Sequence, residues 1–182
     1  MWAAIYAALV LALFVRVQDA TAAARPAPVP GHGEPLRLLG VHHALFYALL
    51  LVVSPLEATA RGGGGQGRAA GALLFVAGVG LYRWGAAALG PALSPLVTPV
   101  AHGQLVTRGP YRLVRHPMYL GQLCIAFGAP LTLGCRWALA VSLAAAIVLV
   151  VRIRMEEDVL SQTYADYGTY RARSKRLVPF VF

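Results

Sequence analysis

Charged residues are scarce in this chain. Only 13% of its 182 residues are charged and 58% are hydrophobic, whereas a soluble domain typically has about 25% charged residues. This composition excludes an ordinary soluble domain and indicates a protein that lies in a lipid bilayer. Nothing in the sequence resembles a nucleic-acid-binding module.

Cysteine is also scarce. Cys124 and Cys135 are the two cysteines, and their spacing does not suit a zinc site, so we interpret both as packing residues and predict no metal. A Gly-x-Gly-x-x-Gly motif after a strand is missing as well, so no Rossmann-type nucleotide fold is expected.

Hydrophobic residues gather in five runs, which predict five membrane helices. A spanning helix needs roughly 17–25 residues, and only the third run reaches that length without its flanking residues. The first run could instead be a signal peptide, but no Lys or Arg precedes it, so we expect a helix there. The short link Gly134–Arg136 predicts that the last two helices form a hairpin. The runs are Met1–Val15, Leu38–Val53, Ala69–Leu89, Met118–Leu133 and Trp137–Val151.

Basic residues fall unevenly on the two sides of this arrangement. With the N-terminus outside, only Arg61, Arg68 and Arg136 of the 16 basic residues lie outside. The positive-inside rule therefore places the C-terminus in the cytoplasm. The net charge of +9 predicts contact with anionic lipid headgroups. Small size and an Ala-, Gly- and Arg-rich composition favour a bacterial inner membrane.

The expected fold is all-α, with a single membrane domain over residues 1–182. Residues 1–68 hold two helices without a recognisable motif, and residues 69–182 hold the motifs described below. The segment Gly85–Gly109 is apolar but interrupted by three prolines. We predict that this loop folds back over the cytoplasmic helix ends and helps to form a pocket.

The C-terminal segment is polar and rich in tyrosine. Tyr164, Tyr167 and Tyr170 are spaced by three, which predicts a short helix that buries them on one face. The basic residues of this segment would then face lipid headgroups. They are Arg171, Arg173, Lys175 and Arg176.

Two polar clusters flank the last two hydrophobic runs. One precedes the fourth run and contains Arg112, Arg115 and His116; the other follows the fifth run and contains Arg152, Arg154, Glu156, Glu157 and Asp158. Ionisable groups are costly near a bilayer, so two clusters at matching depths suggest a binding site. Pro117 suits a first helical turn, whose free N–H groups would bind an anion together with Arg115. Arg152 and Glu156 lie four residues apart on one helical face. Taken singly, each cluster also fits a snorkelling arginine or an ordinary helix pair.

Three spaced motifs resemble the isoprenylcysteine carboxyl methyltransferases, and the phospholipid methyltransferases share them. They are Leu-Val-Thr-Arg-Gly-Pro-Tyr at 105–111, Arg-His-Pro-Met-Tyr-Leu-Gly at 115–121, and Glu-Glu at 156–157 followed by Leu160. The resemblance covers roughly residues 82–182. It implies that S-adenosylmethionine binds on the cytoplasmic side, between the last helices and the preceding loop.

The resemblance also implies the site residues. Arg152 falls at a substrate-side position. The family commonly has His where Gly103 stands, so either the loop shifts by one residue and His102 makes this contact, or the contact is lost. The other implied cofactor contacts are Gln104, Leu105, Val106, Tyr111, His116, Pro117, Met118, Tyr119 and Glu156.

The implied reaction is methyl transfer to a lipophilic acceptor that enters from the lipid. Arg152 would orient an acceptor carboxylate, whereas an amine would need Glu156 or Glu157 to remove its proton. One alternative is an NADPH-dependent reductase of the sterol-reductase type, and another is a membrane interaction protein without turnover. His42 and His43 could form a haem-ligand pair with His116, because all three are expected at a similar depth. Adjacent histidines at a helix start are more often interfacial polar residues, and these two could equally line the acceptor entrance.

Overall fold

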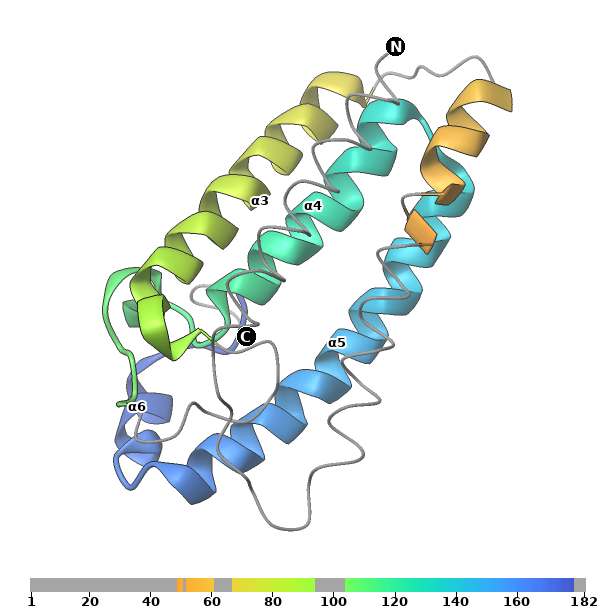
Figure 1. The fold of residues 1–182 in the computed structure, drawn as a ribbon. Helices are drawn as coiled ribbons and strands as arrows, with labels where there is room; N and C mark the ends of the chain where they lie inside the picture. Colours follow the sequence, from red (N-terminus) through yellow and green to blue (C-terminus); the bar gives the residue numbers. More distant parts are fainter. Residues whose placement is uncertain (1–48, 51, 61–66, 94–103, 179–182) are drawn as a thin grey trace.

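The secondary structure is entirely helical in the part of the chain that the computed structural model describes (Figure 1). That part comprises residues 49–50, 52–60, 67–93 and 104–178. Among these residues there is no β-strand, only an isolated parallel bridge between Val114 and Lys175. Several predictions lie outside the described residues: the run Met1–Val15, most of the run Leu38–Val53, His42, His43, His102 and Gly103.

The third and fourth hydrophobic runs form helices whose first and last residues agree with the prediction to within one residue. The fifth run also forms a helix, which continues past its predicted end at Val151. A helical stretch at residues 52–60 comes first. It is followed by α3 (Arg68–Leu89), the 3-10 turns η1 (Gly90–Ala92) and η2 (Gly109–Arg112), α4 (Pro117–Leu133), α5 (Arg136–Thr163) and α6 (Tyr167–Arg173).

α3 and α4 lie side by side with their backbones in close contact (Figure 1). Gly71, Gly78 and Gly85 recur one heptad apart on the buried face of α3. A Cβ added at Gly78 would lie 2.7 Å from the carbonyl oxygen of Gly121, and one at Gly71 would lie 2.8 Å from that of Gly128. Glycine on both helices therefore permits this approach, as in many membrane helix pairs.

α4 and α5 form the predicted hairpin. α4 ends at Gly134, whose φ of 73° lies in the left-handed region that glycine adopts without steric cost, and Cys135 leads into α5. Pro130 has no N–H, so the carbonyl of Ala126 loses its helical donor. The hydroxyl of Ser142 on α5 donates to that carbonyl at 2.5 Å and thereby joins the two helices.

A side chain from a distant helix caps the start of α5. Glu57 accepts the backbone N–H groups of Arg136, Trp137 and Ala138 at 2.8, 2.9 and 3.2 Å. These donors have no partner within their own helix, and the helix dipole favours a carboxylate at this end. The cap therefore ties the stretch 52–60 to the hairpin.

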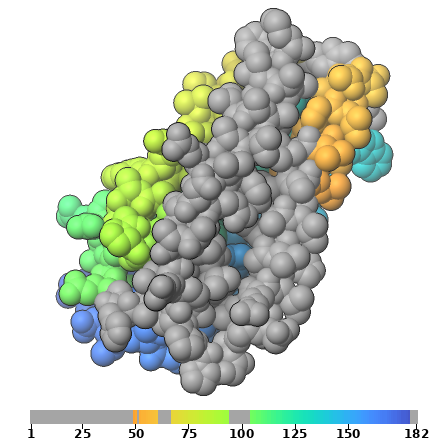
Figure 2. All heavy atoms as spheres, in the orientation of Figure 1, coloured from red at the N-terminus to blue at the C-terminus, as the bar shows by residue number. Residues whose placement is uncertain are grey.

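Among the described residues, two helical stretches are long and apolar enough to cross a membrane, Arg68–Ala92 (α3 with η1) and Arg136–Thr163 (α5), while the apolar α4 is shorter. α3 runs along one flank of the molecule (Figure 2) and exposes large apolar side chains, among them Leu73, Val76 and Trp84. Such a surface suits contact with lipid. The described residues therefore support a helical integral membrane protein, and the five-helix count stays a prediction.

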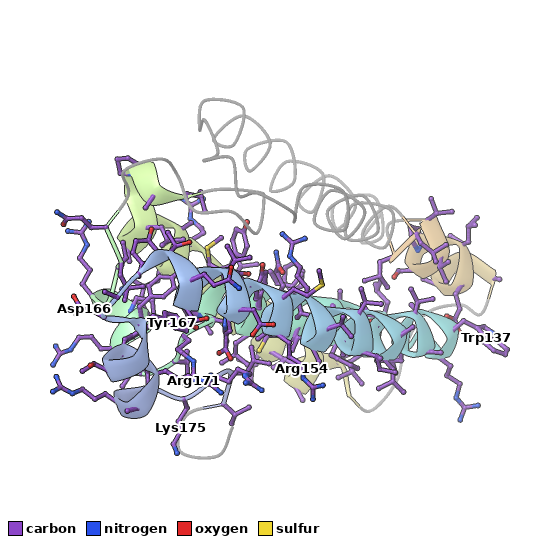
Figure 3. The ribbon with its side chains drawn as sticks, turned by 90° about the horizontal axis from the view of Figure 1, so that it is seen from below. Trp137, Arg154, Asp166, Tyr167, Arg171 and Lys175 are labelled. Carbon is purple, nitrogen blue, oxygen red and sulfur yellow. The ribbon has the colours of Figure 1, made fainter. Side chains whose placement is uncertain are left out.

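α5 continues beyond the start of α4, and α6 lies beside its far end (Figure 1). Figure 3 shows Trp137 at one end of α5 and Tyr167, Arg171 and Lys175 at the other. Tyr164 is the C-terminal cap of α5 and does not belong to α6. The prediction of one helix carrying all three tyrosines is therefore wrong at Tyr164.

Candidate functional site

The corner before α4 is held by backbone pairing with the C-terminal tail. The N–H of Arg115 donates to the carbonyl of Lys175 at 2.7 Å, and the N–H of His116 donates to that of Arg176 at 3.1 Å. Pro117 then begins α4, as predicted, because its missing N–H costs nothing in the first helical turn. This pairing fixes the positions of Arg115 and His116.

Glu157 on α5 is the centre of a buried charge cluster, and its side chain is only 4% exposed. Its Oε1 accepts from Nε of Arg115 at 2.7 Å, and its Oε2 accepts from Nε and Nη2 of Arg176 at 3.1 and 2.8 Å. Nε2 of His116 lies 3.4 Å from Oε1. Two guanidinium groups thus offset the cost of burying one carboxylate. The cluster fastens the tail and the corner before α4 to α5.

Arg115 is predicted to meet an anionic ligand group, but its guanidinium is already engaged. Besides Glu157, it donates to the carbonyl of Arg171 at 3.1 Å and to that of Ser174. Arg176 is predicted to face lipid headgroups and instead turns inward to Glu157. The geometry therefore gives both arginines a positioning role. The buried carboxylate of Glu157 attracts both arginines. The sequence did not predict these pairs because the partners lie 42 and 19 positions apart in the chain.

A single hydroxyl joins the two predicted catalytic residues. The phenol of Tyr119 on α4 donates to Oε2 of Glu156 at 2.6 Å and accepts from Nε of Arg152 at 2.9 Å. The guanidinium carbon of Arg152 lies 5.7 Å from the centre of the Tyr119 ring, on which the His116 ring stacks at 5.6 Å. Oε1 of Glu156 has no hydrogen-bond partner among the described residues. It remains able to accept from a ligand.

Tyr111, a predicted cofactor contact, is buried in η2. Burial and next the charge of Glu156 raise the pKa of Tyr111 well above its ordinary value. The hydroxyl of Tyr170 on α6 donates to the carbonyl of Tyr111 at 2.9 Å. Burial raises the pKa of Tyr170 to about 12, although the charge of Arg115 acts in the opposite direction. Both phenols therefore stay protonated at neutral pH, and α6 is held over η2.

The remaining predicted contacts are more dispersed. Gln104 is exposed, and Leu105 and Val106 are half-buried in the irregular segment before η2. Met118 faces α3, where its Cγ lies 2.7 Å from the position that a Cβ on Gly85 would occupy. Met118 therefore packs between the helices. His102 and Gly103 lie outside the described residues.

The sequence indicated no role in the site for Ser174, or for Arg176 beyond headgroup contact. Ser174 contacts Arg115, 59 positions away, and Arg176 contacts Glu157, 19 positions away. Pairs so far apart in the chain cannot be predicted from the spacing of neighbouring residues. Within the described segments, no group of three or more His, Cys, Asp or Glu side chains is placed to hold a metal ion.

Most residues of this site lie in a segment of the chain that matches a known protein family. A family model described as phospholipid methyltransferase matches residues 67–167, more than half of the chain, and this segment includes α3, α4 and α5. The nickel-cobalt-cadmium resistance protein NccN of Alcaligenes xylosoxydans xylosoxydans is 32% identical over 78 residues. This alignment covers 42% of the chain and 36% of NccN, so the chain spans about a third of that relative's length.

Proposed function

The chain belongs to the phospholipid methyltransferase family, and from this membership we propose that it transfers a methyl group from S-adenosylmethionine to a lipophilic acceptor. Family membership indicates a membrane methyltransferase. The dependence on S-adenosylmethionine, the class of acceptor and the roles of the residues are parts of the proposal.

The observation that carries the proposal is the hydrogen-bonded chain from Arg152 through Tyr119 to Glu156. It sets a cation, a phenol and a carboxylate side by side. S-adenosylmethionine carries amino and hydroxyl donors, which Oε1 of Glu156 can accept. Its sulfonium is favoured near an aromatic face such as that of Tyr111. The residues present therefore fit this group.

The contribution of the protein is mainly positioning. When bound, S-adenosylmethionine supplies an electrophilic methyl group to a nucleophilic atom of the acceptor. Arg152 orients an anionic acceptor group by its charge and its directed N–H groups. Tyr119 holds Arg152 and Glu156 at fixed places through its two hydrogen bonds. Holding reacting atoms in a near-attack geometry contributes about 7–11 kcal/mol.

The protonation state of the acceptor decides whether a base is needed. A carboxylate or thiolate brings its own electron pair and has no proton to lose. An amine must lose a proton, and Glu156 suits this task better than Glu157, since guanidinium donors occupy both oxygens of Glu157. The lipophilic part of the acceptor would enter from the lipid.

Titration of the detergent-purified protein with S-adenosylhomocysteine tests this proposal. We expect saturable binding to the wild-type protein. Glu156→Gln should weaken the binding of S-adenosylhomocysteine by about 10- to 100-fold, because a charge-assisted hydrogen bond is lost. Asp158→Asn is the matched control because Asp158 is exposed on the same helix, and its affinity should match that of the wild type.

Two outcomes would reject the proposal. A folded wild-type protein that binds no S-adenosylhomocysteine would not be a methyltransferase of this kind. Binding of NADPH in a parallel titration, without S-adenosylhomocysteine binding, would favour a reductase instead. Equal losses in Glu156→Gln and Asp158→Asn would leave the assignment of Glu156 without support.

A further inference from the structure

The hydroxyl of Tyr167 is a polar group that the site described above does not use. Tyr167 begins α6, where α6 meets the end of α5 (Figure 3), and is only 1% exposed. Its ring meets that of Tyr170 edge-on, with the ring centres 6.0 Å apart. The hydroxyl oxygen is enclosed and has no hydrogen-bond partner in the described structure. A buried hydroxyl in this state is unfavourable and requires a reason.

Charged neighbours act on this hydroxyl without bonding to it. Burial and next the charge of Glu157 raise the pKa of Tyr167 well above its ordinary value, so the hydroxyl remains a donor at neutral pH. The charge of Glu156 acts in the same direction, whereas that of Arg115 opposes it. Both oxygens of Glu157 already accept from guanidinium groups, and Oε2 of Glu156 accepts from Tyr119. Oε1 of Glu156 is open, but the hydroxyl of Tyr167 makes no hydrogen bond to it or to any other described acceptor.

We propose that the hydroxyl of Tyr167 is a further ligand-binding group, which donates to an oxygen or nitrogen acceptor on the bound methyl donor. This inference rests on the proposed function, and it adds a residue of α6 to a site otherwise formed by η2, α4 and α5. Because the hydroxyl is enclosed, α6 must shift slightly as the ligand binds. α6 has only seven residues, and side-chain hydrogen bonds such as that from Tyr170 to Tyr111 hold it in place.

A pair of Tyr-to-Phe variants on the same helix tests this inference. Tyr167→Phe removes a hydroxyl without a partner and keeps the ring, so the Tm of the free protein should stay equal or rise. Its affinity for S-adenosylhomocysteine should fall about five- to tenfold, as expected for one lost hydrogen bond. Tyr170→Phe removes a hydroxyl that bonds to the carbonyl of Tyr111. It should lower Tm and reduce affinity less than Tyr167→Phe does.

Calorimetric titration and thermal unfolding of the full chain in detergent give both readings. An unchanged affinity in Tyr167→Phe overturns the inference, because the hydroxyl then has no role in binding. A lower Tm in Tyr167→Phe also overturns it, because the hydroxyl then has a partner within the protein. If the folded wild-type protein binds no S-adenosylhomocysteine, the proposed function and this inference fail together.

Discussion

Glu157 is the residue whose loss should destabilise this fold most. Glu157→Gln keeps the size of the side chain but removes its charge, which leaves Arg115 and Arg176 without their buried counter-charge. Breaking a buried ion cluster costs about 3–5 kcal/mol. We expect the lower end of that range, because the side chain of Arg176 keeps 18% exposure to solvent. Unfolding in detergent measures the change.

The neighbouring Asp158 provides the control for this substitution. Asp158 is exposed, and Asp158→Asn should change the free energy of unfolding by no more than about 0.5 kcal/mol, as is usual at the surface. Equal stability in the two variants would show that Glu157 does not hold the C-terminal tail in place.

Glu156 and Glu157 illustrate how adjacent carboxylates take different tasks. Successive residues of a helix point about 100° apart, so the two side chains meet different partners. Glu157 meets two guanidinium groups, which leaves it no capacity for a ligand. Glu156 meets only the phenol of Tyr119 among the described residues and keeps one oxygen open. Stability therefore depends on Glu157 and, under the proposed function, ligand binding on Glu156.

The contact between α3 and α4 should be sensitive to any added side chain. A Cβ at Gly78 would lie 2.7 Å from the Cβ of Cys124 and from the carbonyl oxygen of Gly121. Gly78→Ala should therefore push the helices apart, at a cost of about 1–3 kcal/mol for overpacking. The thermal unfolding of the variant in detergent checks this expectation.

Gly80 on the same helix is the matched control. A Cβ there meets nothing within 4 Å. Gly80→Ala should leave stability unchanged or raise it by up to about 1 kcal/mol, because alanine favours a helix more than glycine does. If both substitutions destabilise the protein equally, the close approach of α3 and α4 is not the cause.

The bounds of α4 could be predicted from sequence because both of its ends coincide with local signals. Pro117 marks the start of α4 and Gly134 its end, and both act through their own backbone. α5 continues to Thr163, well past Val151, because hydropathy reports contact with lipid and not where a helix ends. The spacing of Tyr164 from Tyr167 likewise does not report the break between α5 and α6.

The candidate site could be predicted only as a set of residues. The motifs indicated Tyr119, Arg152 and Glu156, and the structure brings these three together. The partners of each charge could not be predicted. The bond from Arg115 to Glu157 spans 42 positions, and the cap that Glu57 forms on α5 spans about 80. A sequence shows which charges are present, but only the packing of helices decides which of them meet.

We predict the orientation of the chain in the membrane from the length of α5 and from the distribution of the chain's basic residues. α5 has 28 residues, a length of about 42 Å, which exceeds the roughly 30 Å hydrocarbon core of a bilayer. Its start at Arg136 and the tail that contains Lys175 should therefore lie on opposite sides. The exposed basic residues Arg171, Arg173 and Lys175 cluster at the tail end, so we expect that end in the cytoplasm.

Cysteine labelling tests this orientation. In a background with Cys124→Ala and Cys135→Ala, a membrane-impermeant maleimide applied to intact cells should label Arg136→Cys, and Lys175→Cys only after permeabilisation. The background protein alone should remain unlabelled. The candidate-site residues Tyr119 and Glu156 belong to the same end of the molecule as the tail, through the Glu157 cluster. Labelling of Lys175→Cys from outside would place the candidate site away from the cytosol. Since S-adenosylmethionine is charged and does not cross a bilayer unaided, that result would contradict the proposed function as well as the orientation.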